Sequence, residues 1–173
     1  LEDFDPIRLA VLGMRKLEMI SIDEREYSIT KTGRGVEIRL GESLPRNFMI
    51  FEEEVNFTKQ ATQQLKKVRD SDEEDETTTR TVRFVKEFST EFSDKDGSAI
   101  STEKPVSMDS GQAFCLVPLE GFEFPFKFGL DSDWLLNPDR TDFDDDGELW
   151  HQEIMAVVPR LIRKYIQSLS KEE

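Results

Sequence analysis

Apolar and polar residues alternate, or form short apolar runs, through much of the first half of the chain. A period of two is typical of strands with one buried face. A Thr-Gly-Arg-Gly sequence at 32–35 suits a tight turn, so we expect the strands on either side of it to form a hairpin. The pattern predicts strands at residues 18–22, 26–31, 35–40, 48–51 and 79–89.

Three other segments have the composition or the apolar spacing of helices. An Asp-Pro pair suited to a helix N-terminus precedes an apolar stripe, which predicts a short helix at 5–16. Gln, Lys and Leu dominate residues 56–69, which we also expect to be helical. A long apolar stripe at 149–169 indicates a helix packed on a sheet, and Pro159 within it should kink or divide that helix.

The segment between these regions is rich in large apolar side chains. Residues 112–119 are almost continuously apolar, which predicts a strand buried on both faces. Four phenylalanines then follow at a strict period of two and should share one face of a strand: Phe122, Phe124, Phe126 and Phe128.

The pattern as a whole predicts an α+β fold in one domain spanning residues 1–173. We expect a mixed, mainly antiparallel sheet with a short N-terminal helix. The long C-terminal helix should pack on the Phe-rich strand, because four phenylalanines on one face need a large apolar cover.

The charge of the chain excludes two classes of partner. Its 173 residues include 23 Lys and Arg against 37 Asp and Glu, a net charge of −14. Nucleic acids and anionic membranes both require a basic surface, so neither is an expected ligand. The acidic run at 70–76 predicts a flexible, solvated loop at about 70–78, with a site for a basic partner as the alternative.

Cys115 is the only cysteine, which excludes an internal disulfide and favours an intracellular location, cytoplasmic or nuclear. No apolar stretch approaches the roughly 20 residues that span a bilayer. Because the chain opens with Leu1 and not Met, we expect it to be a fragment of a longer protein. His151 is the only histidine, and we expect it on a helix, partly exposed. With so few candidate groups, we do not expect the chain to be an enzyme on its own.

Residues 142–153 match the calcium-binding loop of an EF-hand. Carboxylates occupy loop positions one, three and five, a glycine occupies position six and a glutamate position twelve. A proline precedes the loop where an EF-hand has a helix, and no second copy occurs in the chain. If the loop binds a metal, the cofactor is Ca²⁺ and its ligands are Asp142, Asp144, Asp146 and Glu153.

Two phrases near this loop resemble a known family. Cys-Leu-Val-Pro-Leu at 115–119 is followed at 125–140 by Pro-Phe-Lys-Phe-Gly-Leu-Asp-Ser-Asp-Trp-Leu-Leu-Asn-Pro-Asp-Arg, and Trp-His at 150–151 then opens the last helix. In this order they resemble the end of the ATPase region of sacsin-like and plant NO VEIN-like proteins, whose nucleotide domain is of the Bergerat (GHKL) type. The stretch at 6–22 is similar to that family as well.

The chain also departs from the family pattern. Asn137-Pro138-Asp139 replaces the small hydroxyl residues that usually precede the arginine, and Thr141 replaces the acid that follows it. The nucleotide-binding motifs of the Bergerat domain are absent. The resemblance therefore implies the middle, or transducer, segment that follows the nucleotide domain in a chaperone-type ATPase.

In such ATPases a basic residue of the following domain reaches the γ-phosphate, and the resemblance gives this role to Arg140. Alternatively, Arg140 only pairs with a neighbouring acid, Asp139 or Asp142. The cofactor would be ATP with Mg²⁺, held by the parent protein. Implied partners are the preceding ATPase domain of the same chain, protein clients, and a second copy in a homodimer formed through the parent.

Two other functions stay open at the level of sequence. The chain would be a calcium-binding module if the loop at 142–153 holds the ion. It would be an acidic protein-interaction domain if the run at 70–76 binds a basic partner.

Overall fold

The structure, a computed structural model, describes most of the chain. The predicted helix at 5–16, the acidic run at 70–76 and Arg140 lie outside the described residues. The described residues are 18–22, 25–31, 35–69, 78–95, 98–106, 111–115, 117–119, 126–139 and 141–169.

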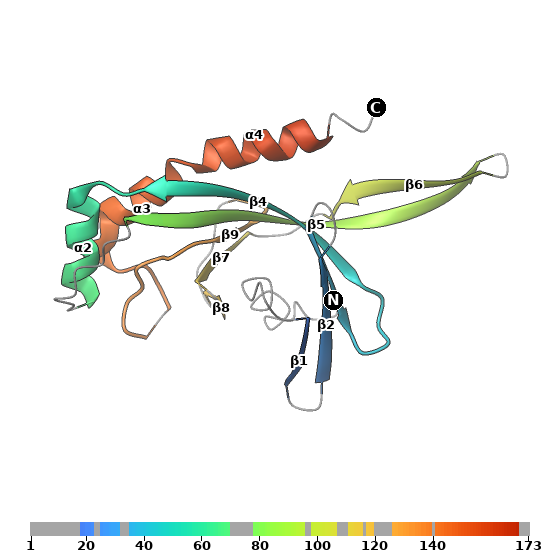
Figure 1. Cartoon of the computed structure of the whole chain (residues 1–173), viewed down its shortest axis with the longest axis horizontal. Coiled ribbons are helices and arrows are strands. Elements are labelled where there is room, and N and C mark those ends of the chain that lie inside the picture. The colour runs from blue at the N-terminus through green and yellow to red at the C-terminus, as the bar shows by residue number, and fades with distance from the viewer. Residues whose placement is uncertain are drawn as a thin grey trace.

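Strands and helices are labelled in Figure 1. The strands are β1 (Met19–Ile22), β2 (Arg25–Lys31), β3 (Gly35–Leu40), β4 (Arg46–Asn56), β5 (Thr79–Lys95), β6 (Ser98–Pro105), β7 (Gln112–Cys115), β8 (Val117–Pro118) and β9 (Gly129–Asp131). The helices are α2 (Lys59–Arg69), α3 (Glu148–Met155) and α4 (Val158–Leu169), with a 3₁₀ turn η1 (Asp145–Gly147) before α3.

One sheet contains all of these strands, in the order β1-β2-β3-β4-β5-β9-β7-β8, with β6 also paired to β5. Every pairing is antiparallel except that of β7 with β9, which is parallel. The predicted α+β fold with a mixed, mainly antiparallel sheet is therefore confirmed. So is the hairpin of β2 and β3, in which Ile29 lies opposite Ile38.

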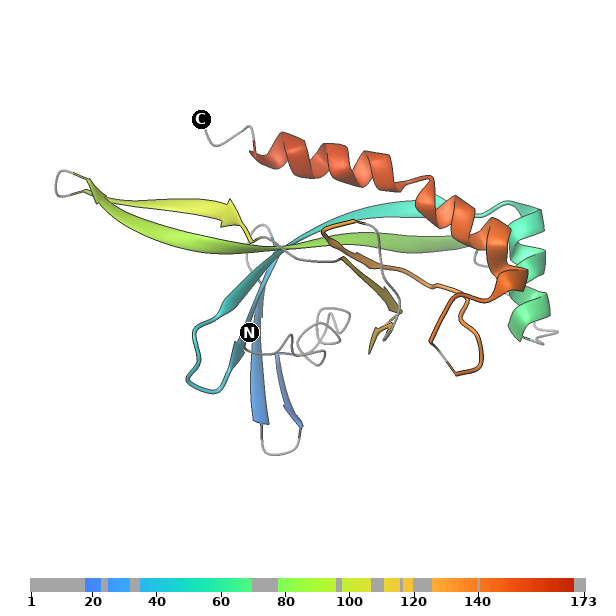
Figure 2. The same ribbon diagram turned by 180° about the vertical axis from the view of Figure 1, so that it is seen from behind.

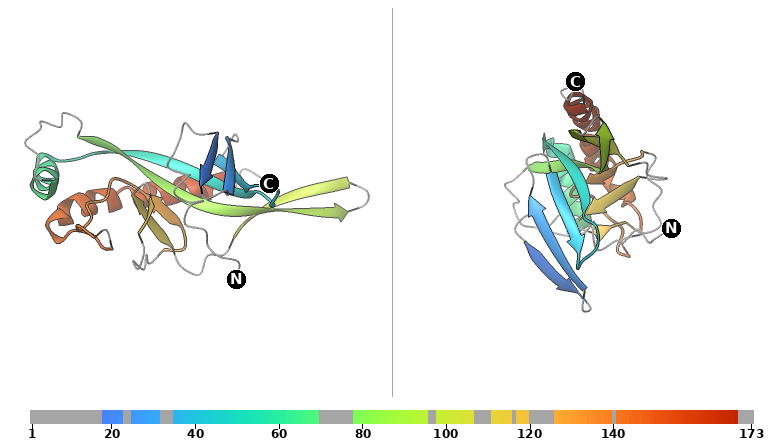
Figure 3. Two further views of the ribbon diagram at one scale, coloured as in Figure 1. Left: turned by 90° about the horizontal axis from the view of Figure 1, so that it is seen from below. Right: turned by 90° about the vertical axis from the view of Figure 1, so that its right-hand side faces the viewer.

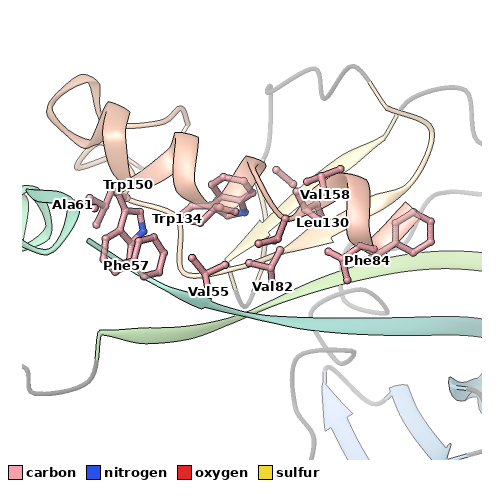
Figure 4. Packing of buried hydrophobic residues seen from close by; sticks show 14 of the residues in the cluster. Val55, Phe57, Ala61, Val82, Phe84, Leu130, Trp134, Trp150 and Val158 are labelled. Carbon is pink, nitrogen blue, oxygen red and sulfur yellow. The ribbon is translucent and has the colours of Figure 1, made fainter. Parts of the chain in front are cut away.

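The long strands β4 and β5 form the centre of the sheet, and each of their faces covers a separate apolar cluster. The alternation predicted for residues 79–89 is confirmed, because Val82 and Phe84 lie in one cluster and Val85 in the other. The first cluster, shown in Figure 4, lies under the helices. The second contains Phe48 of β4 together with residues of β2 and β3, namely Tyr27, Ile29 and Ile38.

The C-terminal helical segment is divided, as Pro159 predicts. Helix α3 ends at Met155, and α4 begins at Val158, so the proline lies in the first turn of α4, where its missing N–H costs least. Figures 1 and 2 show α4 running along β4 and β5. Lys164 fixes it there, since its ammonium group donates to the Glu52 carbonyl at 2.7 Å and pairs with Glu53 at 2.9 Å.

Aromatic rings fill the space beneath α4. The Tyr165 ring lies 5.1 Å from that of Phe84, and burial raises the pKa of its hydroxyl. Of the four phenylalanines predicted to share a face, Phe126 and Phe128 are described, and they lie in the bend just before β9. The Phe128 ring is 4.5 Å from that of Phe84. The predicted packing of the C-terminal helix on a phenylalanine cluster is thus confirmed, with β5 supplying its central ring.

The apolar segment at 112–119 differs from its prediction. It forms two short strands, because Cys115 of β7 lies opposite Val117 of β8 and the chain reverses between them. A continuous apolar run does not reveal such a reversal, since Ala113 before it and Leu119 after it are both buried. Strand β6 was not predicted, because residues 98–105 are mostly small or polar.

Buried Lys86 is the exception on the apolar face of β5. Its side chain is 9% exposed, and its ammonium group donates to the Lys127 carbonyl at 2.9 Å. Burial lowers the pKa of Lys86. The hydrogen bond satisfies the charged group at the point where β5 changes its partner from β9 to β6.

Candidate functional site

Asp133, in the phrase that resembles the ATPase family, joins three elements of the fold. Its carboxylate accepts hydrogen bonds from Arg69 of α2 at 2.6 Å and from Arg80 of β5 at 2.9 Å. Its backbone carbonyl accepts a hydrogen bond from the indole nitrogen of Trp150, in α3, at 2.6 Å. We call this arrangement the Asp133 junction.

Trp150 is the apolar centre of the Asp133 junction. Its side chain is fully buried, and its ring stacks on Phe57 at a centroid distance of 3.6 Å with the two planes 3° apart. Its backbone N–H donates to the Gln64 amide oxygen at 3.1 Å, which holds the start of α3 against α2. The two phrases of the resemblance, separated by an acidic spacer in the sequence, therefore form one structural unit.

Residues 137–142 form a closed loop above this unit. Its two stems meet in an isolated β-bridge between Leu136 and Phe143. Two backbone hydrogen bonds close it further: Asp144 N–H donates to the Leu135 carbonyl at 2.9 Å, and Asn137 N–H to the Asp142 carbonyl at 3.1 Å. The two ends of the loop are thus fixed by residues of the packed core.

The tip of the loop faces solvent. Asp139 and Thr141 are exposed, and Arg140 between them lies outside the described residues. The Asp139 carboxylate accepts hydrogen bonds from the Thr141 hydroxyl at 2.7 Å and from its backbone N–H at 3.1 Å. These bonds lower the pKa of Asp139, so the tip carries a fixed negative charge beside Arg140.

His151 packs against both stems of the loop. Its Nε2 lies 3.0 Å from the Leu135 carbonyl, so that nitrogen carries a proton and donates. The ring lies 4.8 Å from the ring of Phe143 on the other stem. Burial lowers the pKa of His151, while the Leu135 bond and the charge of Asp144 oppose that shift. The predicted partly exposed position on a helix is confirmed; its contact with the loop could not be read from the sequence.

The four carboxylates of the EF-hand-like loop are held by separate partners. Asp144 accepts from the backbone N–H of Asp146 at 2.9 Å and so caps η1. Asp146 pairs with Lys67 at 2.9 Å. The Asp142 carboxylate accepts from the next backbone N–H, that of Phe143, at 2.7 Å.

Glu153 faces the beginning of α2. Its two carboxylate oxygens accept from the Thr58 backbone N–H at 2.9 Å and from the Thr58 hydroxyl at 2.5 Å. No three His, Cys, Asp or Glu side chains within the described part of the chain are grouped as a metal site requires. The four carboxylates are thus not gathered around one point, and calcium binding by this loop stays a prediction.

Gly147 is needed here because a small residue fits the packing, and not because the backbone takes a left-handed conformation. Its φ is −93°, which other residues also adopt. A Cβ at this position would lie 3.0 Å from both Leu135 and His151, so the residue must be small for η1 to lie against the loop stem. A glycine at loop position six therefore has a second physical explanation.

Comparison with known protein families, with curated proteins and with solved structures finds no match for this chain. No helix within the described ranges is both long enough and apolar enough to cross a bilayer. The functional argument therefore depends on the geometry of the chain's own residues.

The first prediction concerns His151, whose titration can be followed by NMR because it is the only histidine. Its ring should titrate below the ordinary value of 6.5. Between the folded-state pKa and 6.5, the unfolded chain binds a proton that the folded chain does not. The free energy of unfolding should therefore decrease as the pH falls through this window.

The matched variant is His151→Gln, whose amide still has a donor for the Leu135 carbonyl. In this variant the part of the pH dependence that comes from His151 should vanish. A ring that titrates at or above 6.5, or a variant with the wild-type pH dependence, would contradict the role given to burial.

The second prediction distinguishes two roles of Glu153: accepting hydrogen bonds from Thr58 and binding calcium. In buffer containing EDTA, Glu153→Gln should lower the free energy of unfolding by about 1 kcal/mol, a typical loss for one hydrogen bond. The reason is that an amide has one acceptor oxygen, whereas Thr58 donates two hydrogen bonds. Urea unfolding measures the change.

Glu148→Gln, in the same helix, is the control and should cost less, because Glu148 accepts a bond only one turn away, from Gln152. If Glu153→Gln is as stable as the wild type in EDTA and loses only a stabilisation that calcium provides, Glu153 acts as a calcium ligand and not through its bonds to Thr58.

Proposed function

We propose that this chain is the coupling module, middle- or transducer-like, of a larger sacsin-like, chaperone-type ATPase. In this function it donates Arg140 to the ATP site of a preceding nucleotide-binding domain. It does not hydrolyse ATP on its own, and its parent binds ATP and Mg²⁺. Client proteins would be engaged by the parent as it cycles between open and closed states.

The closed loop at 137–142 is the observation that carries this proposal. A residue that acts in a neighbouring domain must be exposed, and the described residues at the tip, Asp139 and Thr141, are exposed. It must also be held in position, since small displacements of a catalytic group are costly. The bridge between Leu136 and Phe143 and the bond from Asp144 to Leu135 supply such a base.

The chemistry of arginine suits the role. A guanidinium is always charged and can contact two phosphate oxygens at once. The nearest acid along the chain, Asp139, already accepts two hydrogen bonds from Thr141. Both bonds end on Oδ1, so they leave pairing of Arg140 with Asp139 as the alternative that the turnover test separates from a phosphate-directed role.

The Asp133 junction supports a coupling role. It ties the base of the loop to α2 through Arg69, to the central strand β5 through Arg80 and to α3 through Trp150. A displacement of the loop would thus reach β5 and α3 through the part-buried contacts of Arg80 and Trp150, and α2 through the exposed contact of Arg69. A transducer needs this property, because nucleotide state in one domain must move another.

The test is ATP turnover by a longer protein that carries this chain after a nucleotide-binding domain. Arg140→Ala should reduce turnover at least a hundredfold while nucleotide binding is retained, because arginines supplied in this way contribute roughly 10³ to 10⁵ in rate. Arg140→Lys should restore only part of the rate, since lysine keeps the charge but not the planar fork.

Arg163→Ala is the control, because Arg163 is exposed on α4. Its turnover should equal that of the wild type. Unchanged turnover in Arg140→Ala would reject the role of Arg140, and an active parent that lacks a Bergerat-type domain would reject the coupling function as a whole.

A further inference from the structure

Strand β4 has an open edge along its second half. On one side β5 pairs with it from Asn47 to Asn56, whereas β3 on the other side pairs with it only as far as Met49. Beyond Met49, none of the strand pairings of the described residues uses that side of β4. Figures 1 and 3 show the helices α3 and α4 beside this part of β4.

A hydrogen bond at the end of β4 shows which backbone groups face this edge. Phe57 N–H donates to the Thr78 carbonyl, so odd-numbered residues here direct their backbone groups toward β5. Even-numbered residues alternate with them and direct their N–H and C=O groups outward, toward the helices. In the second half of β4 these are Glu52, Glu54 and Asn56.

Side chains of the two helices complete the hydrogen bonds at both ends of this stretch. At one end, Lys164 of α4 donates to the outward carbonyl of Glu52 at 2.7 Å. At the other end, Glu153 of α3 accepts from the outward N–H of Thr58 at 2.9 Å. Among the described residues, no hydrogen bond uses the outward groups of the two even-numbered residues in between.

A cavity of about 340 Å³ lies where these backbone groups are left open. It is lined by residues 54–56 of β4 and by Glu153, Ala156, Val157 and Arg160 of the helical segment. Its volume is within the range of ligand sites. One wall therefore offers backbone donors and acceptors, and the other offers a small apolar surface and a cation.

Arg160 is the cation that this cavity leaves without a counter-charge. Its side chain is exposed and forms no ion pair with any described residue. Lys164, one helical turn further along, is paired with Glu53. The carboxylate of Glu54 lies on the opposite face of the strand from buried Val55, because side chains alternate along a strand. A carboxylate entering the cavity thus meets a free guanidinium, which binds it with charge-assisted hydrogen bonds.

We propose that this edge binds an extended peptide whose C-terminal carboxylate is held by Arg160. The peptide adds a short strand to β4 and pairs with the outward groups of Glu54 and Asn56. Because Glu153 contacts Thr58 and Lys164 contacts Glu52, the helical segment runs opposite to β4. Arg160 therefore lies toward the Glu52 end, and a peptide that ends there runs antiparallel to β4. This proposal concerns the chain itself and does not depend on the proposed function.

The short length of the open edge favours a chain end over an internal segment or a strand of a second copy. Lys164 and Glu153 occupy the edge on either side, so only the groups between Glu52 and Thr58 remain for pairing. An internal segment has to pass both of these side chains. A C-terminus stops beside Arg160 and leaves the cavity at one end only.

The test is fluorescence anisotropy of the 173-residue chain with a labelled peptide, Gly-Ser-Gly-Val-Val-Val, whose valines favour an extended backbone. The peptide with a free C-terminal carboxylate should bind. The same peptide with a C-terminal amide should bind about tenfold more weakly, because it has no charge for Arg160. Methylation of successive valine nitrogens should weaken binding at alternate positions, because alternate residues of a strand face its partner.

Two variants of the chain separate the carboxylate contact from general charge effects. Arg160→Gln should weaken binding of the free-acid peptide about tenfold and leave binding of the amide unchanged. Glu54→Gln should bind the peptide at least as well as the wild type does, because it only removes a like charge. Arg163→Gln, which changes an exposed arginine of the same helix outside the cavity lining, is the control and should match the wild type. Circular dichroism checks that each variant is folded.

Amide hydrogen exchange locates the peptide on the edge. The amides of Glu54 and Asn56 should exchange rapidly in the free chain and slowly with the peptide bound. Absence of binding up to about 1 mM peptide overturns the proposal, as does equal binding of the free-acid and amide peptides. Binding that leaves exchange of these two amides unchanged places the peptide elsewhere. Slow exchange in the free chain shows that another segment or a second copy covers the edge, and both results also overturn the proposal.

Discussion

The hydrogen bond from the Trp150 indole to the Asp133 carbonyl is the contact on which the helical half of the structure depends. It fixes α3 to the segment after β9, and the stacking of Trp150 on Phe57 then fixes both to the end of β4. The carboxylate of Asp133 adds α2 and β5 through two arginines. One residue thus uses its side chain and its backbone to close the junction between elements that are distant in the sequence.

The unequal lengths of β4 and β5 shape the rest of the molecule. Where the two strands overlap, the helices cover one face of the sheet, and the second cluster lies on the other face around Phe48 and Val85, whereas Glu52 and Glu54 are exposed. Where β5 extends beyond β4, β6 is its partner among the described strands. The base of the loop at 137–142 lies beside the helices, whereas the ribbon of β5 and β6 projects from the other end of the sheet (Figure 1).

Much of the architecture can be predicted from the sequence, because the apolar patterns of strands and helices are local. The alternation in β2, β3 and β5 and the stripe of α4 with its break at Pro159 predicted elements that the structure contains. The site was less predictable. The partners Asp133 and Trp150 are joined by a fold that no local pattern encodes. Glu153 matches a calcium-loop position by residue type, while its carboxylate accepts two hydrogen bonds from Thr58, the residue before α2. Strand β6 escaped prediction because strand pairing, not apolar content, stabilises it.

Amide hydrogen exchange of Trp150→Phe tests the central role of the Asp133 junction most directly. The substitution keeps an aromatic ring against Phe57 but removes the indole donor together with part of the buried ring volume, which leaves the Asp133 carbonyl without that partner. The account predicts that the Asp144 amide, which closes the loop, exchanges about tenfold to a hundredfold faster. The Ile29 amide, in the second cluster, should be unchanged. Equal exchange at Asp144 in both proteins would contradict the account, because the loop would then not depend on the junction.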